Sequence, residues 1–287
     1  MNRQFPLLSA RLSVDYPNKP LVLRDVQLEI QRGEILGLVG QSGSGKSTLA
    51  LALLQLLHLK GGKVRGEALL NGEDLLRQTQ KQLRSIRGRL ISVVLQSPLT
   101  SLNPALRIRA QLAEAWQAHV QSSGEECQTA VRQALSSVGL PCDDEFLRRR
   151  PSQLSVGQAQ RVTIAMAILH RPALLIADEA TSALDSITQS EILQLFARLN
   201  RELGMAILFI SHDLLSVAAL CHRIAILKDG CIVECGSPEQ IFCWPQNEYT
   251  RKLIDALPSS PFRPVLDKDS NSSDTFELAS PIVAKGR

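Results

Sequence analysis

A glycine-rich segment constrains the fold of this 287-residue chain more than any other feature of its sequence. The segment consists of Gly40, Gln41, Ser42, Gly43, Ser44, Gly45, Lys46, Ser47 and Thr48. Its first eight residues match the pattern G-x-x-x-x-G-K-[S/T]. A short apolar run at 35–39, typical of a strand buried on both faces, precedes it, and an apolar helical pattern from Lys46 to about Leu57 follows it. This strand–loop–helix order predicts a phosphate-binding loop in an α/β fold.

The residue types of this loop fit phosphate chemistry. Gly40, Gly43 and Gly45 let the backbone approach phosphate oxygens closely, so that consecutive N–H groups point inward. The helix that begins near Lys46 adds the positive end of its dipole. We expect Lys46 to reach the β- and γ-phosphates of a nucleotide and the Ser47 hydroxyl to ligate Mg²⁺. A glycine-rich turn without function is the alternative, and the strand before the loop and the helix after it disfavour that interpretation.

Two acidic residues follow a second apolar strand pattern, at 173–177. Asp178 is placed to hold Mg²⁺, usually through water, and Glu179 is placed to polarise an attacking water. Two acids after a strand are by themselves more typical of a helix N-terminus. Together with the phosphate loop, they predict a site that hydrolyses a nucleotide.

The apolar periodicity divides the chain into regions. Alternation with a period of two at 8–14, 26–30 and 64–71 predicts half-buried antiparallel strands. Helical patterns dominate from about 98 to 170, and strands and helices alternate again from 173 to 210. Such alternation indicates crossover connections and a parallel sheet. The expected fold is therefore an α/β P-loop NTPase core with an N-terminal antiparallel β-subdomain and an inserted α-helical subdomain.

The C-terminal region is expected to complete this fold and then to lose order. Two strands at 223–227 and 231–234 and two short helices at 238–243 and 248–257 follow the alternating region. We expect one nucleotide-binding domain over residues 1–258. The Ser/Pro/Asp-rich tail at 259–287 lacks a usable period, which predicts disorder.

Composition excludes several classes of function. The 32 basic and 28 acidic residues leave a net charge of only +4, dispersed along the chain, so no nucleic acid partner is expected. No apolar run approaches the roughly 18–20 residues that span a bilayer, and no signal-peptide pattern follows Met1. We expect the chain to stay in the cytoplasm, where it could still dock to an integral membrane partner. Free thiols are the expectation for its six cysteines, with a metal or iron–sulfur role for Cys231, Cys235 and Cys243 as the alternative.

The letters LSVGQ at 154–158 indicate which class of phosphate-loop protein the chain resembles. The Ser155 side chain and the Gly157 N–H would form an anion site at a helix N-terminus. The pentapeptide resembles the LSGGQ signature of the ABC ATPases, and the resemblance extends over residues 7–257. That family uses the signature on the γ-phosphate held by another subunit, which implies such a role for Ser155, Gly157 and Gln158. Standing alone, the pentapeptide would favour an ordinary helix cap.

Four further segments resemble motifs of the same family. Gln96 follows a strand pattern, like the Q-loop glutamine that touches Mg²⁺ and reports occupancy to the membrane subunits. The residues 182–185 look like the D-loop, and His212 looks like the switch histidine that contacts the γ-phosphate. Tyr16 resembles the aromatic residue that stacks on adenine, although Asp15-Tyr16-Pro17 could also form a simple turn.

Two segments point to one subfamily. The sequence at 96–104 resembles the Q-loop extension of the dipeptide, oligopeptide and nickel importers, and 245–253 resembles the P-x-H-P-Y-T-x-x-L ending of that subfamily, with Asn-Glu in place of His-Pro.

Two departures from the family pattern stand out. Val156 replaces the first signature glycine, which implies reduced or retuned activity, and Ala180 replaces the proline that commonly follows the catalytic acid.

The resemblance implies a working assembly. Two ATPase subunits, identical or different, would close head to tail around two ATP molecules, each with Mg²⁺. They would serve two integral-membrane permease subunits, and indirectly an extracytoplasmic solute-binding protein, from the cytoplasmic face of the plasma (inner) membrane. Peptides are the first expectation for the cargo and nickel or another chelated metal the second. A regulatory ATP-binding subunit with a degenerate signature is the competing interpretation.

Overall fold

The computed structural model describes residues 5–17 and 19–257. The strands of this part of the chain are β1 Leu8–Tyr16, β2 Lys19–Ile30, β3 Ile35–Val39, β4 Lys63–Leu70, β5 Glu73–Asp74, β6 Ile91–Val94, β7 Leu174–Asp178, β8 Ala206–Ser211, β9 Arg223–Lys228 and β10 Cys231–Gly236. Its helices are α1 Lys46–Leu53, α2 Gln80–Ile86, α3 Pro98–Ser101, α4 Ile108–Gln117, α5 Gly124–Ser137, α6 Asp144–Arg148, α7 Val156–Ile168, α8 Ser186–Leu203, α9 Leu214–Leu220, α10 Pro238–Cys243 and α11 Glu248–Asp255. Three short 3-10 helices lie at Leu57–Lys60, Leu75–Arg77 and Pro151–Gln153.

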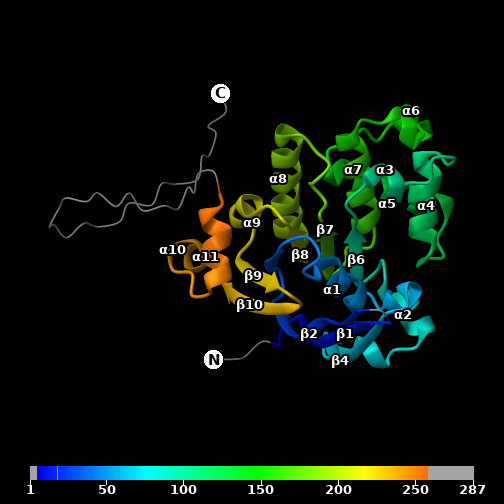
Figure 1. Cartoon of the computed structure of the whole chain (residues 1–287). Helices are drawn as coiled ribbons and strands as arrows, with labels where there is room; N and C mark the ends of the chain where they lie inside the picture. The colour runs from blue at the N-terminus through cyan, green and yellow to red at the C-terminus, as the bar shows by residue number, and fades with distance from the viewer. Residues whose placement is uncertain (1–4, 18, 258–287) are drawn as a thin grey trace, which may run out of the picture.

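The strands form two sheets. A four-stranded antiparallel sheet has the order β2-β1-β4-β5, and a six-stranded sheet has the order β10-β9-β3-β8-β7-β6. In the larger sheet, β9, β3, β8, β7 and β6 run parallel, and β10 pairs with β9 antiparallel at the edge. The antiparallel sheet lies at the bottom of Figure 1, the helices α3 to α7 lie at the upper right, and α10 and α11 lie at the opposite end. The predicted α/β core, antiparallel β-subdomain and helical subdomain are therefore all present.

The central strand β3 separates two hydrophobic cores. Leu36 and Leu38 pack with α1 and the antiparallel sheet. Ile35 and Val39, which alternate with them, pack in a core that includes α4, α5, α7 and α8. All five residues of β3 are buried, as expected for a parallel strand covered on both faces. This burial holds the end of β3 firmly at the start of the phosphate loop.

The structure corrects several predicted element bounds. The first helix ends at Leu53 rather than near Leu57, because Gln55 takes a left-handed φ of 53° and a 3-10 turn follows. The strand expected at 26–30 begins already at Lys19, and the left-handed residues Leu21 and Asp25 interrupt its alternation. The short helices α2, α6 and α9 were not predicted. The tail at 259–287, expected to be disordered, lies outside the described residues.

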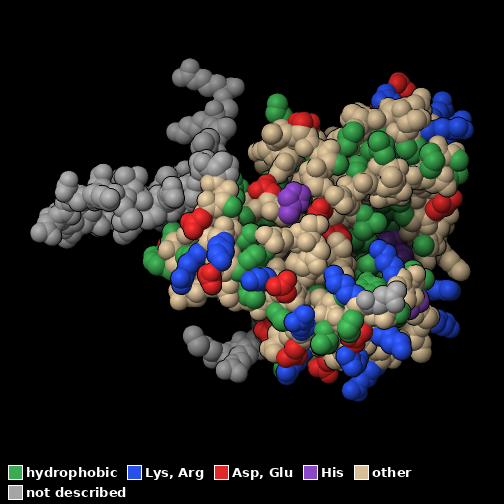
Figure 2. Space-filling view, viewed as in Figure 1, with side chains coloured by type: hydrophobic (Ala, Val, Ile, Leu, Met, Phe, Trp, Pro, Cys, Tyr) green, Lys and Arg blue, Asp and Glu red, His purple; other side chains and the backbone are tan. Residues whose placement is uncertain are grey.

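Charged side chains of both signs lie on the face of the described chain that Figure 2 shows. On the face shown in Figure 2, acidic and basic side chains lie interspersed over the antiparallel sheet at the bottom of the view. Within residues 5–17 and 19–257, no helix has both the length and the apolar character needed to cross a bilayer. Cys127, Cys142, Cys221, Cys231 and Cys235 are free thiols, and the described part of the chain holds no cluster of three or more potential metal-ligating His, Cys, Asp or Glu side chains.

Candidate nucleotide site

The phosphate loop connects the end of β3 to the start of α1. At Gly40, a Cβ atom would lie 2.2 Å from the carbonyl oxygen of Leu227 on β9. Gly45 has a φ of 111°, and a Cβ there would lie 2.6 Å from the Cδ2 atom of Leu23 on β2. Gly40 is therefore required by the close approach of the β9 backbone, and Gly45 by its left-handed conformation and by the close side chain of Leu23.

Lys46 lies buried under this loop. Its side chain is only 5% exposed, and Nζ donates hydrogen bonds to the carbonyl oxygens of Gly40 at 2.7 Å and Gln41 at 3.1 Å. Nζ also lies 4.0 Å from Oε1 of Glu179. Burial lowers the pKa of the ammonium, and the charges of Glu179 and Asp178 oppose that shift. A buried cation therefore faces the space in front of the loop.

The two predicted acids stand where β7 ends. The Ser47 hydroxyl donates a hydrogen bond to Oδ1 of Asp178 at 3.2 Å. Burial raises the pKa of the Asp178 carboxyl, and the hydrogen bond from Ser47 opposes that shift. Glu179 takes a left-handed φ of 49°, and its N–H donates to the carbonyl oxygen of Ile210 on the neighbouring strand β8. The left-handed residue turns the chain so that both carboxylates reach the phosphate loop.

His212 follows β8 and lies beside Glu179. Its Nδ1 atom is 3.6 Å from Oε2 of Glu179, and its side chain is 59% exposed. The site thus draws on the carboxyl ends of the parallel strands β3, β7 and β8, the edge at which α/β sheets bind ligands.

A cavity of about 580 Å³ opens in front of the loop. Its lining brings together loop residues with three of the predicted site residues, Tyr16, Gln96 and Glu179. The complete lining is Tyr16, Lys19, Val22, Ser42, Gly43, Gly45, Lys46, Ser47, Thr48, Gln96 and Glu179. Lys19 and Val22 from β2 were not predicted, because the irregular start of that strand gives no alternation to follow.

The LSVGQ segment does not join this cavity. Ser155 caps α7 in a capping box, accepting from the Gln158 N–H at 3.1 Å while the Gln158 side chain accepts from the Ser155 N–H. Val156 is 40% exposed. A Cβ at Gly157 would lie 2.9 Å from Cγ2 of Thr188 on α8. The segment therefore packs against the start of α8, and none of its residues lines the cavity described above.

One contact of the loop was missed in the sequence. The hydroxyl of Tyr249 on α11 accepts a hydrogen bond from the Gln41 N–H at 3.2 Å. The tyrosine belongs to the segment at 245–253 singled out by its resemblance to the subfamily ending, but nothing in that pattern indicates a contact with the loop.

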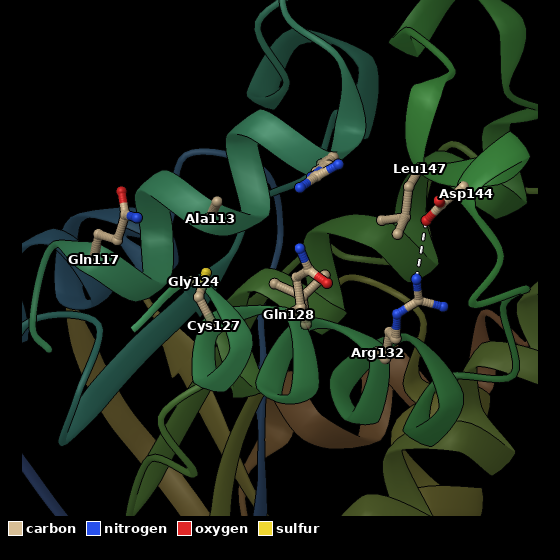
Figure 3. Close-up of a pocket in the computed structure, with 10 residues that line it drawn as sticks. Ala113, Gln117, Gly124, Cys127, Gln128, Arg132, Asp144 and Leu147 are labelled. Carbon is tan, nitrogen blue, oxygen red and sulfur yellow. Dashed lines mark hydrogen bonds and ion pairs between the residues drawn. The ribbon is translucent and has the colours of Figure 1, made fainter. Parts of the chain in front are cut away.

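A second cavity, of about 140 Å³, lies within the helical subdomain. Figure 3 shows it between Ala113 and Gln117 of α4, Cys127 and Gln128 of α5, and Leu147 of α6. One ion pair closes an end of it, Arg132 to Asp144 at 2.9 Å. It shares no lining residue with the cavity at the phosphate loop.

Comparison with known proteins places these features in a family. The ABC transporter family model matches residues 23–182. The glutathione import ATP-binding protein GsiA of Escherichia coli O1:K1 is 43% identical over 247 residues, which are 84% of this chain and 40% of that protein. GsiA of Salmonella choleraesuis is 44% identical over 242 residues, 82% of this chain and 39% of that protein. The chain thus spans about two fifths of the length of these curated relatives.

Solved structures show the same likeness. The structure of cbiO1 from Clostridium perfringens, described as part of the ABC transporter complex cbiONQ, superimposes with a TM-score of 0.73 at 27% identity, covering 89% of this chain and 97% of that one. The ATP-binding cassette MJ0796, a dimer in a post-hydrolysis state with ADP and Pi, superimposes with a TM-score of 0.69 at 30% identity, covering 80% of this chain and 98% of that one. The chain belongs to the ABC transporter family and has the fold of its ATP-binding cassette.

Proposed function

We propose that this chain binds and hydrolyses ATP to energise import across a membrane. The observation that carries the proposal is the convergence of Lys46, Ser47, Asp178 and Glu179, from two separated segments, at one cavity edge. A buried ammonium beside two carboxylates suits a magnesium-bound triphosphate better than an uncharged ligand. Residues 1–258 would form the nucleotide-binding domain, with the helical subdomain at about 98–170.

The residues at this edge fit Mg²⁺. Ser47, Asp178 and Gln96 offer only oxygen ligands, the type that Mg²⁺ prefers. The hydrogen bond between Ser47 and Asp178 already brings two of these oxygens within 3.2 Å of each other. When bound, Mg²⁺ would neutralise charge on the β- and γ-phosphates of ATP. A cation would also offset the burial of the Asp178 carboxyl, whose pKa is raised in its absence.

The chain's own groups would perform the hydrolysis. Lys46, held in place by the carbonyl oxygens of Gly40 and Gln41, would direct its remaining N–H to phosphate oxygens, and the loop N–H groups of residues 42–48 would enclose the phosphates. Glu179 would accept the proton of the attacking water, with His212 holding the water and the γ-phosphate in line. Tyr16 would stack on the adenine. Catalysis would rest mainly on positioning and charge stabilisation.

A second ATPase subunit would complete each site. Ser155, Gly157 and Gln158 stand outside the chain's own cavity, and the solvent-exposed Val156 beside them leaves the segment open to a partner. We propose that they cap the γ-phosphate bound to a second subunit, identical or different. The dimeric state of the MJ0796 cassette with ADP and Pi supports this arrangement.

The region that follows Gln96 would contact the membrane partner. An apolar groove of about 330 Å³ lies between strand β6 of the core and helix α7 of the helical subdomain. Its lining includes Leu95, Ser101 and Met166. We propose that two integral-membrane permease subunits dock at this side from the cytoplasmic face of the inner membrane, with a solute-binding protein outside. The residues 96–104 would pass closure of the ATP site to them.

The names of the relatives support a proposal for the cargo. Both named relatives are glutathione import proteins, and glutathione is a tripeptide. A di- or oligopeptide is therefore the proposed cargo, with nickel or another metal chelate as the second candidate. Because Val156 replaces the first signature glycine, it favours one alternative from another class of function. In that alternative the chain is a regulatory ATP-binding subunit paired with an active ATPase.

Phosphate release by the purified chain tests the proposal. The chain is assayed with Mg-ATP alone and mixed with a candidate partner ABC ATPase, together with Glu179→Gln in each state. Turnover that depends on Glu179 supports hydrolysis by this chain. ATP binding without phosphate release in either state would favour the regulatory subunit, and no ATP binding would refute both.

A further inference from the structure

The C-terminal helix α11 reaches the phosphate loop through one side chain. Tyr249 is 8% exposed, and its hydroxyl accepts a hydrogen bond from the Gln41 N–H at 3.2 Å, across 208 residues of sequence. In Figure 1, α11 lies beside β9 and β10, at the end of the sheet away from the helical subdomain. This contact is the link between the C-terminal segment and the nucleotide site.

The peptide unit that Tyr249 holds also serves Lys46. The Gln41 N–H and the Gly40 carbonyl belong to the same peptide group, and the Lys46 ammonium donates to that carbonyl at 2.7 Å. The N–H and C=O of a planar trans peptide point in opposite directions. The hydrogen bond to Tyr249 on one side therefore fixes the direction of the carbonyl that holds Lys46 on the other side.

The surroundings of Tyr249 keep its ring in place. The Glu234 carboxylate accepts from the N–H groups of Gln246 at 2.8 Å and Asn247 at 3.1 Å, just before α11 begins. The Asn247 side chain then caps α11 by accepting from the Tyr249 N–H at 2.9 Å. The Lys228 ammonium lies 5.0 Å from the centre of the tyrosine ring, a cation–π contact from the end of β9.

We propose that Tyr249 is a positioning residue for ATP binding, which sets the orientation of the Gly40–Gln41 peptide and through it the resting place of Lys46. The inference rests on the proposed binding of ATP at this loop. Tyr249 touches neither the nucleotide nor the reacting atoms, so its effect falls on the affinity for ATP and not on the hydrolysis step. The C-terminal segment thereby takes part in the nucleotide site from outside the cavity.

The test compares two single hydroxyl deletions on α11. Tyr249→Phe removes the acceptor and keeps the ring. Thr250→Val is the matched control, because Thr250 is fully buried and its hydroxyl has no hydrogen-bond partner among the described residues. Each full-length variant is measured for ATP affinity by calorimetry, for KM and kcat, and for the exchange rate of the Gln41 amide hydrogen.

We expect Y249F to bind ATP about three- to tenfold more weakly, as for the loss of one hydrogen bond, with KM raised and kcat within about twofold of the wild type. The Gln41 amide should exchange severalfold faster in Y249F and unchanged in T250V. Wild-type affinity in Y249F, or an equal loss in T250V, overturns the inference alone. A wild-type chain that binds no ATP overturns the proposed function, and the inference with it, so the two failures are distinguishable.

Discussion

The hydroxyl of Ser47 donates a hydrogen bond to Asp178 at 3.2 Å, and so joins the first turn of α1 to the end of β7 across 131 residues of sequence. The two residues are far apart in the chain, and they meet because the parallel strands β3, β8 and β7 are neighbours in the sheet. Under the proposed function, these two oxygens would hold a magnesium ion in place of the hydrogen bond between them.

Ser47→Ala should therefore raise the magnesium concentration needed for half-maximal ATP hydrolysis, by roughly tenfold. The reason is the loss of one oxygen ligand with Asp178 left in place. A magnesium titration of phosphate release measures this, and Ser47→Thr, which keeps a hydroxyl, is the control. An unchanged magnesium requirement in Ser47→Ala would remove this residue from the metal site.

Glu179→Gln should lower turnover by about 10²- to 10⁴-fold, because an amide does not accept the proton of the attacking water. ATP affinity should remain, since Lys46 and the loop backbone are unchanged. Phosphate release and equilibrium ATP binding measure the two effects separately. Glu202→Gln, an exposed change on α8, is the control and should behave as the wild type. Equal turnover in both variants would sink the assignment of Glu179 as the base.

Val156→Gly should raise turnover and lower stability together. The glycine removes a β-branched, 40%-exposed side chain from the segment offered to the partner's phosphate. The unfolding free energy should fall by about 0.5–1 kcal/mol, because glycine at the first position of α7 has a higher conformational entropy when unfolded. Phosphate release and urea unfolding measure the pair. Val156→Ala separates the causes, since it removes the branched side chain while keeping the helix propensity high.

Gly45→Ala should abolish ATP binding and reduce the unfolding free energy by about 1–3 kcal/mol, because it adds a steric clash with Leu23 to left-handed strain. Gly72→Ala is the matched control for strain alone: φ is 85° there, and a Cβ would meet nothing within 4 Å. Calorimetric ATP binding and urea unfolding check both variants. An intact ATP affinity in Gly45→Ala would contradict the tight loop geometry.

His119 should make stability depend on pH. Burial, the neighbouring His170 and Arg89 lower the pKa of His119 below its ordinary value near 6.5. Below that value the unfolded chain takes up a proton that the folded chain resists, so stability is complete above about pH 6.5 and falls as the pH decreases. Urea unfolding at pH 7 and at pH 5 measures the effect. The unfolding free energy should fall less between these two pH values in His119→Gln than in the wild type. The exposed His58→Gln is the control and should follow the wild type.

Sequence patterns were sufficient to predict the structure of motifs whose residues are neighbours in the chain. The phosphate loop and the acids at 178–179 each depend on residues that are neighbours in the chain, so their spacing alone predicts their structure. The alternation of strands and helices predicted a parallel sheet, and β3, β8 and β7 do run parallel, but it did not predict the order of the strands. The structure places Tyr16 and Gln96 in the lining of the loop cavity, and the roles that the family resemblance implies for them stay predictions.

Long-range contacts without a periodic pattern were not predictable. The hydrogen bond from Gln41 to Tyr249 joins two segments that no motif connects. The helices α2 and α9 have only seven residues each, too few to display a helical period. Lys19 reaches the cavity from β2, a strand interrupted by the left-handed residues Leu21 and Asp25. The sequence there shows no alternation of polar and apolar residues from which to predict the side that each residue faces.

The left-handed backbone at Glu179 has a cost that glycine would avoid. A glutamate in that conformation gives up about 1–2 kcal/mol relative to a residue without a Cβ. In a regular strand, successive side chains face opposite sides, so the acid pair at 178–179 would be split. Under the proposed function, folding and hydrolysis therefore make opposite demands on position 179. Glu179→Gly would give a chain that is more resistant to unfolding and unable to turn over ATP, a trade-off located at a single backbone dihedral.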